Sequence, residues 1–555
     1  MAVAPRFKAK TAHVNMMTDT IIANLPDDTL RSVVRAILTV ETSVTPIFEE
    51  QARQHLQRIL GQPMGLLFTS TAGRAQTTPE FALSQQRIRS AIGCGLVFES
   101  LPLLKDIVDQ SANLLGPGEA QIPPVLDRTL ASVDGDIVQA LTAVQKRLLS
   151  SKGSREFTAE EKPVMHALLT SMLQCRELWL NVGEDFPFER GISVMATMLC
   201  DSATTNTLLH HPTRYNNCIV RETAIASVET FPLRDISLPR LFSGLWQLSS
   251  PSWGVASQSQ MFKQFAAYIG RGFTAFDMAD HYGDAEVIFG RLRASLPHPS
   301  DVFGATKYCV FHNITVTPQV IRANVTERCR RMGAEKVDLL QFHWQDYNDR
   351  QYIRTLQLLQ QDERVRYLGL CNFDTDRLHQ VIESGVDIVT NQVQFSLIDA
   401  RPRFRMDVVC EKYNVKLLTY GTLCGGFLAD KWLGKPEPHL FGSDSTPSQR
   451  KYFEMIQTWG DWQLFQKLLH TLKCIANKHK VTISNVATRW VLDFPYVGAV
   501  IVGARMGVSE HTEENLETYG WHLDEDDQRS IECILMQSRR EEVFKAMGDC
   551  GSEYR

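Results

Sequence analysis

The 555-residue sequence lacks several features that mark particular classes of protein. No uninterrupted apolar run approaches the ~18 residues of a membrane-spanning helix, and the first residues lack the apolar core of a secretory signal. The net charge of −5 argues against a nucleic-acid-binding surface, which would be basic. The twelve cysteines include no C-x-x-C pair, which favours reduced thiols in a cytoplasmic protein over a disulfide framework or a zinc site.

The length of the chain predicts two or more domains, because single domains usually run to ~100–250 residues. In the first part of the chain, apolar residues recur at helical spacing. The clearest stripe consists of Leu30, Val33, Val34, Ile37 and Leu38. Thr158 and Glu161 match a capping box and predict the start of a further helix. We therefore predict an all-α domain over residues 1–222.

This helical region carries no chemical motif that assigns it a role. The adjacent pair His210 and His211 invites a metal-site interpretation. Adjacent histidines without a third ligand at helical spacing are more often surface or packing residues. The sequence therefore predicts no metal site and leaves the role of residues 1–222 open.

From about Thr223 the pattern changes to short β-branched and apolar runs that alternate with longer amphipathic ones. The predicted strands are Leu238–Gln247, Thr274–Met278, Val302–Lys307, Val337–Phe342, Tyr367–Leu370, Ile388–Val393, Lys416–Tyr420 and Gly498–Val502. Most intervals between them, at ~20–35 residues, suit parallel strands joined by helices. Eight such units predict a (β/α)8 TIM barrel over residues 223–555, whose functional site gathers at the carboxyl ends of the strands.

One interval in this barrel pattern is unusually long. About 80 residues separate Tyr420 from Gly498, too many for a structureless loop in a compact domain unless the loop is functional. We expect an excursion over the active site followed by a helix over Leu464–Lys478. A short hairpin over Ala224–Phe231 is expected to close the other end of the barrel.

Polar residues stand at three successive strand ends. Asp277 and Tyr282 follow the second predicted strand, Lys307 ends the third, and His343 follows the fourth. A phenol has a pKa of ~10, and a nearby ammonium lowers it, so this set suits proton transfer. Asp280 is the alternative to Asp277, since both flank one loop; strand alternation favours Asp277.

In this order and position, the four residues resemble the active site of the aldo-keto reductase family. The resemblance covers roughly residues 225–555. It implies that Tyr282 is the general acid that protonates a carbonyl oxygen as hydride arrives. Lys307 would lower the pKa of that phenol, Asp277 would hold Lys307, and His343 would bond the substrate oxygen.

The same resemblance implies a nicotinamide cofactor held by further strand ends. Asn372 and Gln392 would contact the carboxamide, with Cys371 in the place where the family usually has Ser. Tyr420 would stack on the nicotinamide ring, and Gly421 and Leu423 would lie along the pyrophosphate.

The final signature follows the eighth predicted strand. Arg505 would bind a 2′-phosphate and favour NADPH, because cations and helix N-termini attract phosphate. His511 stands where the family commonly has Arg, which keeps NADH open. Glu514 and Asn515 would contact the adenine.

Aromatic residues near the strand ends suggest an apolar or ring-shaped substrate. Trp246 and Trp344 are the predicted pocket walls. The favoured function is an NAD(P)H-dependent oxidoreductase that reduces an aldehyde or ketone, or runs the reverse reaction. The alternative is a cofactor-binding sensor whose helical half docks a partner protein. A third interpretation, a fused second catalytic domain, has no motif support.

Overall fold

The computed structural model describes residues 16–71, 74–114, 122–150, 153–209, 228–249, 253–311, 313–438 and 446–555. His210, His211 and the predicted domain boundary at residues 222/223 lie outside these ranges. Within them, no helix combines the length and the apolar character that crossing a membrane requires.

The N-terminal domain is a bundle of helices around its own apolar core, as the sequence predicts. Its helices are α1 (Met16–Asn24), α2 (Asp27–Val40), α3 (Thr45–Ile59), α4 (Pro79–Gly93), α5 (Val97–Ala112), α6 (Pro124–Leu148), α7 (Glu161–Asn181), α8 (Glu189–Leu199) and α9 (Ser202–Leu209). The predicted capping box is present at α7, where Thr158 Oγ1 accepts from the Glu161 amide and Glu161 accepts from the Thr158 amide.

Two small antiparallel hairpins interrupt this helical domain, which is therefore not purely α. They are β1 (Phe68–Thr71) with β2 (Arg74–Thr77), and β3 (Leu149–Ser150) with β4 (Gly153–Ser154).

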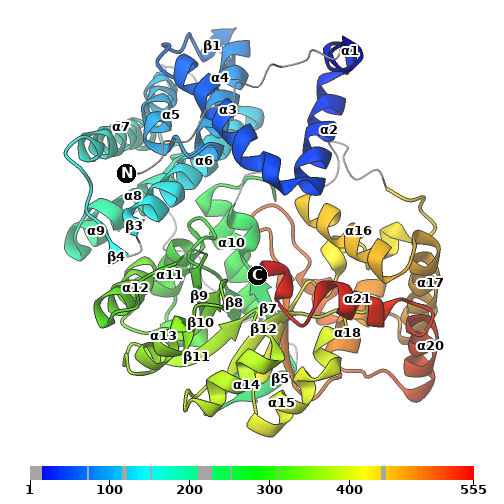
Figure 1. The fold of residues 1–555 in the computed structure, drawn as a ribbon. Helices are drawn as coiled ribbons and strands as arrows, with labels where there is room; N and C mark the ends of the chain where they lie inside the picture. Colours follow the sequence, from blue (N-terminus) through cyan, green and yellow to red (C-terminus); the bar gives the residue numbers. More distant parts are fainter. Residues whose placement is uncertain are drawn as a thin grey trace, which may run out of the picture.

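The second domain is a closed barrel in which each strand pairs with the next in parallel (Figure 1). Its strands are β7 (Leu241–Gly244), β8 (Ala275–Asp277), β9 (Phe303–Val310), β10 (Val337–Trp344), β11 (Val365–Cys371), β12 (Thr390–Gln394), β13 (Lys416–Tyr420) and β14 (Val497–Gly503). Each lies on one of the eight predicted segments, so the (β/α)8 prediction is confirmed. Pairing of β14 with β7 closes the ring.

Helices surround the barrel and bury their apolar faces against it. They are α10 (Gln258–Gly270), α11 (Ala285–Ser295), α12 (Pro318–Arg331), α13 (Gln351–Gln360), α14 (Thr375–Glu383), α15 (Met406–Tyr413), α16 (Pro447–Trp459), α17 (Trp462–His479), α18 (Ile483–Leu492), α19 (Thr512–Leu516), α20 (Glu525–Leu535) and α21 (Arg540–Met547).

A hairpin closes the amino-terminal end of the barrel, but its position differs from the prediction. It consists of β5 (Thr230–Leu233) and β6 (Ile236–Pro239), whereas residues 224–227 of the predicted segment lie outside the described ranges. Phe231 of β5 packs against Phe242 of β7 and leaves no room for a side chain at Gly498. The end of the barrel opposite the strand C-termini is thus filled.

The long excursion after β13 contains two helices. The predicted helix is present as α17, and the sequence did not predict α16, which precedes it. Lys451 of α16 lies 5.8 Å from the centre of the Tyr420 ring at the end of β13. The excursion therefore reaches the mouth of the barrel, as expected.

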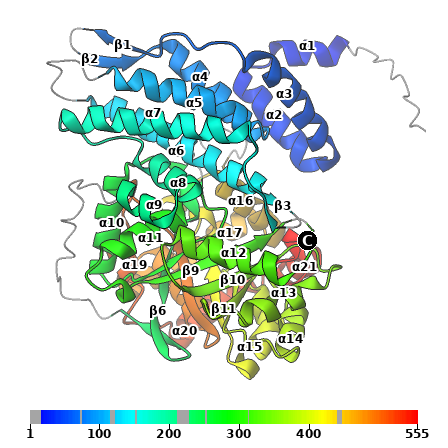
Figure 2. The same cartoon turned by 90° about the vertical axis from the view of Figure 1, so that its left-hand side faces the viewer.

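The helical domain is seated on one side of the barrel, with α6 and α8 nearest to it (Figure 2). Val287 of α11 belongs to the apolar core of the helical domain. Gln145 of α6 donates to Glu327 of α12 at 2.5 Å. The two domains thus share buried apolar and polar contacts along α11 and α12.

Candidate active site

The predicted acid–lysine pair is present and buried. Lys307 on β9 donates to Asp277 at the end of β8 at 2.6 Å and to the Met278 carbonyl at 2.8 Å. Burial alone would lower the pKa of Lys307, but the Asp277 carboxylate more than offsets this and raises it. Lys307 is therefore a fixed cation near neutral pH.

Tyr282 lies in the loop between β8 and α11, beside this cation. The Lys307 Nζ atom is 4.8 Å from the centre of the Tyr282 ring. Burial raises the pKa of the phenol, and the charge of Lys307 opposes that rise without cancelling it. The sequence predicted that Lys307 lowers the pKa of Tyr282. The Lys307 charge does act in that direction, but burial raises the pKa by more. The hydroxyl is thus protonated near neutral pH.

His343 projects from β10 into the same mouth. Its Nδ1 lies 3.1 Å from the Cys371 carbonyl oxygen, which only accepts, so Nδ1 carries the proton. Burial, and secondarily the charge of Arg555, lower the pKa of His343 to about 4. Its buried Nε2 has no hydrogen-bond partner among the described residues. In this neutral tautomer, Nε2 is an acceptor that a hydroxyl group would satisfy.

Two glutamine side chains complete the surroundings of Asp277. Gln341 and Gln392 donate to Asp277 Oδ1 at 2.9 and 2.7 Å, and Gln392 also donates to Gln341 at 2.8 Å. The NH2 group of Gln392 is therefore engaged inside the barrel. Sequence reasoning missed Gln341, although strand alternation places it on the same face of β10 as His343.

The predicted carboxamide and ring-stacking residues meet at the ends of β11 and β13. The Tyr420 hydroxyl donates to Asn372 Oδ1 at 2.9 Å and lies 3.1 Å from the Tyr554 hydroxyl. The Tyr554 ring also packs edge-on against His343, with centroids 5.6 Å apart. Arg555 donates to the Asn372 carbonyl at 2.6 Å. Residues 551–555 thus cover this part of the mouth, which nothing in the sequence predicted.

Gly421 and Leu423 lie in the turn after β13. Gly421 has φ +71°, and the Tyr452 hydroxyl of α16 occupies the space that a side chain would need. Leu423 precedes the 3-10 turn Cys424–Gly426 and is half-buried. Only glycine fits at position 421, because both the backbone conformation and the close contact exclude a Cβ.

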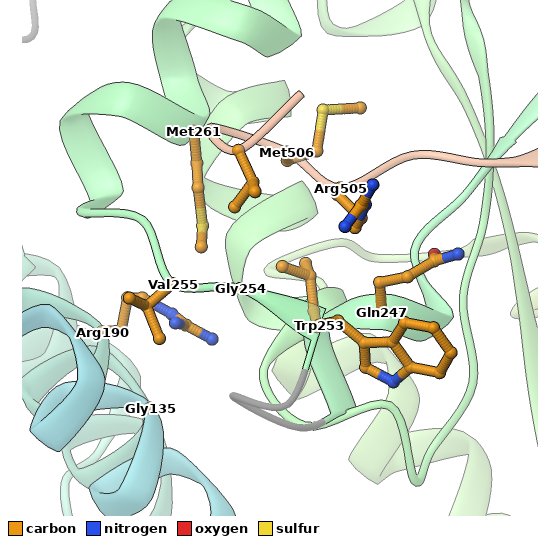
Figure 3. A pocket seen from close by; sticks show the side chains of 11 residues that line it. Gly135, Arg190, Gln247, Trp253, Gly254, Val255, Met261, Arg505 and Met506 are labelled. Atoms are coloured by element: carbon orange, nitrogen blue, oxygen red, sulfur yellow. The ribbon is translucent and has the colours of Figure 1, made fainter. Parts of the chain in front are cut away.

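Arg505 follows β14 and is exposed, without a carboxylate partner among the described residues. It lines a cavity of about 20 Å³ beside Gln247 and Trp253, facing Arg190 of the helical domain (Figure 3). This volume suits about one water, so the enclosed space by itself is too small to hold a substrate.

The remaining predicted adenine-side residues lie near α19. His511 Nδ1 is 3.6 Å from Glu514, and both side chains are largely exposed. Glu514 also accepts weakly from Thr482 at 3.4 Å. The backbone N–H of Asn515 donates to the backbone carbonyl of His511 at 2.9 Å. These contacts fix the segment locally and leave its outer face open to solvent.

The two predicted pocket tryptophans have different surroundings. Trp246 is 39% exposed at the end of β7, with its ring 5.0 Å from that of Trp253. Trp344 is only 1% exposed and packs near Tyr352 of α13. Adjacent strand residues point to opposite faces, so His343 faces the mouth and Trp344 faces the helices. The pocket-wall prediction for Trp344 is thus corrected.

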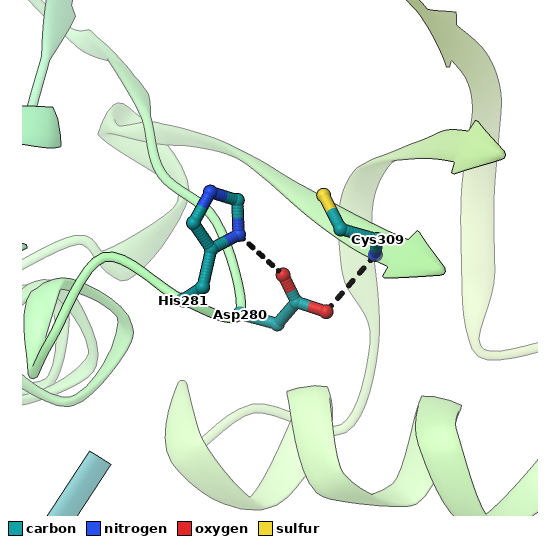
Figure 4. A group of neighbouring side chains, drawn as sticks. All are labelled: Asp280, His281 and Cys309. Atoms are coloured by element: carbon teal, nitrogen blue, oxygen red, sulfur yellow. Dashed lines mark hydrogen bonds and ion pairs between the residues drawn. The ribbon is translucent and has the colours of Figure 1, made fainter. Parts of the chain in front are cut away.

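Asp280, the alternative partner for Lys307, belongs to a different group (Figure 4). It accepts from His281 Nδ1 at 3.0 Å and the Cys309 amide at 2.9 Å, and pairs with Arg328 at 3.4 Å. Burial would raise the pKa of Asp280, but the His281 bond and the Arg328 charge hold it at about 2. Ligand atoms of Asp280, His281 and Cys309 lie within 4.8 Å of one another. The Arg328 cation already neutralises the carboxylate, so we assign no metal here.

The chain is similar in sequence to several known proteins. The chain is 31% identical over 186 residues to "Flagellar radial spoke protein 5" of Chlamydomonas reinhardtii, which covers 29% of this chain and 35% of that protein. It is 23% identical to "Aldo-keto reductase YhdN" of Bacillus subtilis (strain 168), over 54% of this chain and 91% of that protein. It is 23% identical to "NADH-specific methylglyoxal reductase" of Escherichia coli (strain K12), over 53% and 93%.

The family model of the aldo/keto reductases matches residues 240–535, which span the barrel. That match covers more than half of the chain, and the residues before 240 lie outside it. The chain therefore belongs to the aldo/keto reductase family, whose members are oxidoreductases that act on carbonyl groups with a nicotinamide cofactor.

Proposed function

We propose that this protein is a nicotinamide-dependent oxidoreductase that interconverts an aldehyde or ketone with its alcohol, with Tyr282 as the proton-exchanging group. The observation that carries the proposal is the buried Lys307–Asp277 pair, with Lys307 Nζ 4.8 Å from the Tyr282 ring. An immobilised cation beside a phenol stabilises the phenolate that forms when the proton leaves.

The proton steps follow from the states of these side chains. Protonated Tyr282 donates its proton to the carbonyl oxygen during reduction, and Lys307 stabilises the resulting phenolate. Asp277 and its two glutamine donors hold Lys307 in place. His343 Nε2 then accepts a hydrogen bond from the newly formed hydroxyl. The same groups serve oxidation in reverse.

The residues at the mouth fit a nicotinamide nucleotide. When bound, the nicotinamide of this nucleotide would supply or accept the hydride. The Tyr420 hydroxyl bonds to the Asn372 side chain at the strand ends, and these two residues would hold the nicotinamide ring and its carboxamide. The Tyr554 hydroxyl lies 3.1 Å from that of Tyr420, so Tyr554 would border a bound nicotinamide. Arg505 is an exposed cation with no carboxylate partner in the described part of the chain, and it favours NADPH over NADH.

The substrate class follows from the same mouth. Half-exposed Trp246 and Trp253 form an aromatic edge beside β7 and suit an apolar or ring-shaped carbonyl compound.

The described cysteines are all free thiols, which supports a reducing compartment such as the cytoplasm.

The test is Tyr282→Phe in the full chain, assayed with a panel of carbonyl compounds and both NADPH and NADH. Turnover falls by at least ~10³-fold, because the ring remains but its proton is lost. Nucleotide affinity, measured by quenching of tryptophan fluorescence, changes little. Undiminished turnover in this variant would refute the role of Tyr282.

A second candidate, a cofactor-binding subunit whose helical half docks a partner protein, has one structural observation in its favour. Helix α2 has no buried residue and exposes Val33, Ile37 and Val40, the last at 87%. Exposed apolar faces commonly mark interaction surfaces. If this function is the correct one, Tyr282→Phe leaves partner binding intact and Ile37→Lys abolishes it.

A further inference from the structure

The residue two positions after Tyr282 is held by the helical domain. Arg190 in the first turn of α8 donates two hydrogen bonds to Asp284, each of 2.8 Å. Arg190 is 4% exposed and Asp284 is fully buried. Such a bidentate pair fixes both the distance and the orientation of the carboxylate. The helical domain therefore sets the position of the chain at Asp284.

The Asp284 side chain does not cap the helix that it precedes, because its carboxylate is bonded to Arg190. Asp284 is the N-cap residue of α11, yet its side chain caps no backbone amide. Aspartate is among the preferred N-cap residues because its carboxylate accepts from free amides of the first turn. Here the carboxylate turns to Arg190 instead. The start of α11 is thus fixed by another domain.

The intervening residue, Gly283, is held from the same side. Its carbonyl accepts from Arg331 at 2.6 Å, and Arg331 donates to Gln145 of α6 at 2.7 Å. Gly283 has φ +59°, and a side chain here would meet the Leu248 carbonyl and Val138 of α6. The turn that follows Tyr282 is packed directly onto α6.

Arg190 is itself braced within the helical domain. The Asp134 carboxylate of α6 accepts from the amides of Arg190 and Gly191 at 3.3 and 2.8 Å. The backbone that carries the Arg190 side chain is thus fixed within the helical domain. By contrast, the hydrogen bonds of the Tyr282 backbone within the described part of the chain join it to its near neighbours Ala279 and Ala285.

We propose that Arg190 is a positioning residue for Tyr282, and that the helical domain completes the active site by holding the β8–α11 loop. This inference rests on the proposed role of Tyr282. A misplacement of ~1 Å in a reacting group costs about 100-fold in rate. The contact therefore matters for turnover more than for nucleotide binding, which uses other strand ends.

The primary test is Arg190→Met in the full chain. The value of kcat for carbonyl reduction falls by ~10- to 100-fold. The dissociation constant for NADPH stays within about threefold, because Asn372 and Tyr420 are untouched. Arg190→Lys, which keeps the charge but loses the two-pronged contact, recovers part of kcat. A kcat equal to the unaltered protein's overturns the proposal.

The matched control is Arg176→Met. Arg176 is 3% exposed and pairs with Glu189 at 2.8 Å, and its other bond goes to the Leu208 carbonyl, so its partners lie within the helical domain. It removes an equally buried arginine without touching the barrel and leaves kcat within about twofold. An equal loss in this variant means a general loss of structure and overturns the proposal. If Arg190→Met fails to fold, the double variant Arg190→Met/Asp284→Asn, which removes both charges of the pair, replaces it.

Combination with Tyr282→Phe separates the role of Arg190 from the role of Tyr282. Residues that act as a unit have non-additive effects, so Arg190→Met adds little to the loss in the Tyr282→Phe background. Full additivity overturns the positioning role. If Tyr282→Phe alone keeps full turnover, the proposed function fails instead, whatever Arg190→Met does.

Discussion

The two ends of the active-site mouth are built differently. Around β8 and β9, Asp277, Lys307 and their glutamine donors are buried and bonded to one another. After β14, Arg505 and His511 are exposed and have few partners. The first end needs an ordered set of charges before any ligand arrives, whereas the second needs free charge that a ligand can take up. The β8–β9 end of the site is thus ordered in advance, and the end after β14 is left free to bind a ligand.

The largest expected effect breaks the ordered end. Lys307→Met leaves Asp277 as a buried, uncompensated carboxylate, so we expect a loss of ~3–5 kcal/mol in the free energy of unfolding. Turnover falls along with it, because the phenolate has no cation. Urea unfolding and steady-state kinetics measure the two effects. Lys451→Met, which removes a half-buried lysine of α16, should leave stability nearly unchanged.

The next largest effect is expected at Asp134, which bonds to the backbone amides of Arg190 and Gly191. Burial raises the pKa of Asp134 to about 7, although Arg190 and the amides that it accepts from oppose the shift. A carboxyl whose folded pKa exceeds its unfolded value stabilises the fold at low pH and loses that contribution as pH rises through about 7. The shift corresponds to roughly 4 kcal/mol.

Asp134→Asn should therefore flatten the dependence of unfolding free energy on pH between about 4 and 8. Urea unfolding at several pH values measures this. An unchanged slope in the variant would show that other groups cause the dependence.

A smaller effect is expected at the open end. Arg505→Ala should weaken NADPH binding by about tenfold or more, the value of a charge-assisted contact, and alter NADH binding little. Stability should stay within ~0.5 kcal/mol, since an exposed, unpaired side chain is removed. Fluorescence titration with both nucleotides gives the comparison. Equal losses for both nucleotides would mean that Arg505 does not contact a 2′-phosphate.

The smallest effect lies between the two ends. Burial is the main reason that the pKa of His343 is lowered to about 4, and the Arg555 charge comes second. Arg555→Ala should raise this pKa only modestly, so the imidazole stays neutral at pH 7. Titration of the His343 ring signals by NMR measures the shift. A rise to the ordinary value would make Arg555, rather than burial, the dominant cause.

The sequence by itself determined the eight strands and the order of Asp277, Tyr282, Lys307 and His343. Short β-branched and apolar runs mark each strand locally, and parallel strands of a barrel must bring their carboxyl ends together. The opposite orientations of His343 and Trp344 also follow from alternation, so the pocket-wall prediction for Trp344 was avoidable.

Only the tertiary structure decided which groups surround those residues. Arg190 and Asp284 are 94 positions apart, and Tyr554 and Tyr420 are 134 apart, so no local pattern links them. The raised pKa of Tyr282 likewise depends on burial, which the whole fold creates. The pattern that marks a strand depends on residues close together in the sequence. The packing of the helical domain and the barrel around the β8–α11 loop depends on residues far apart in the sequence.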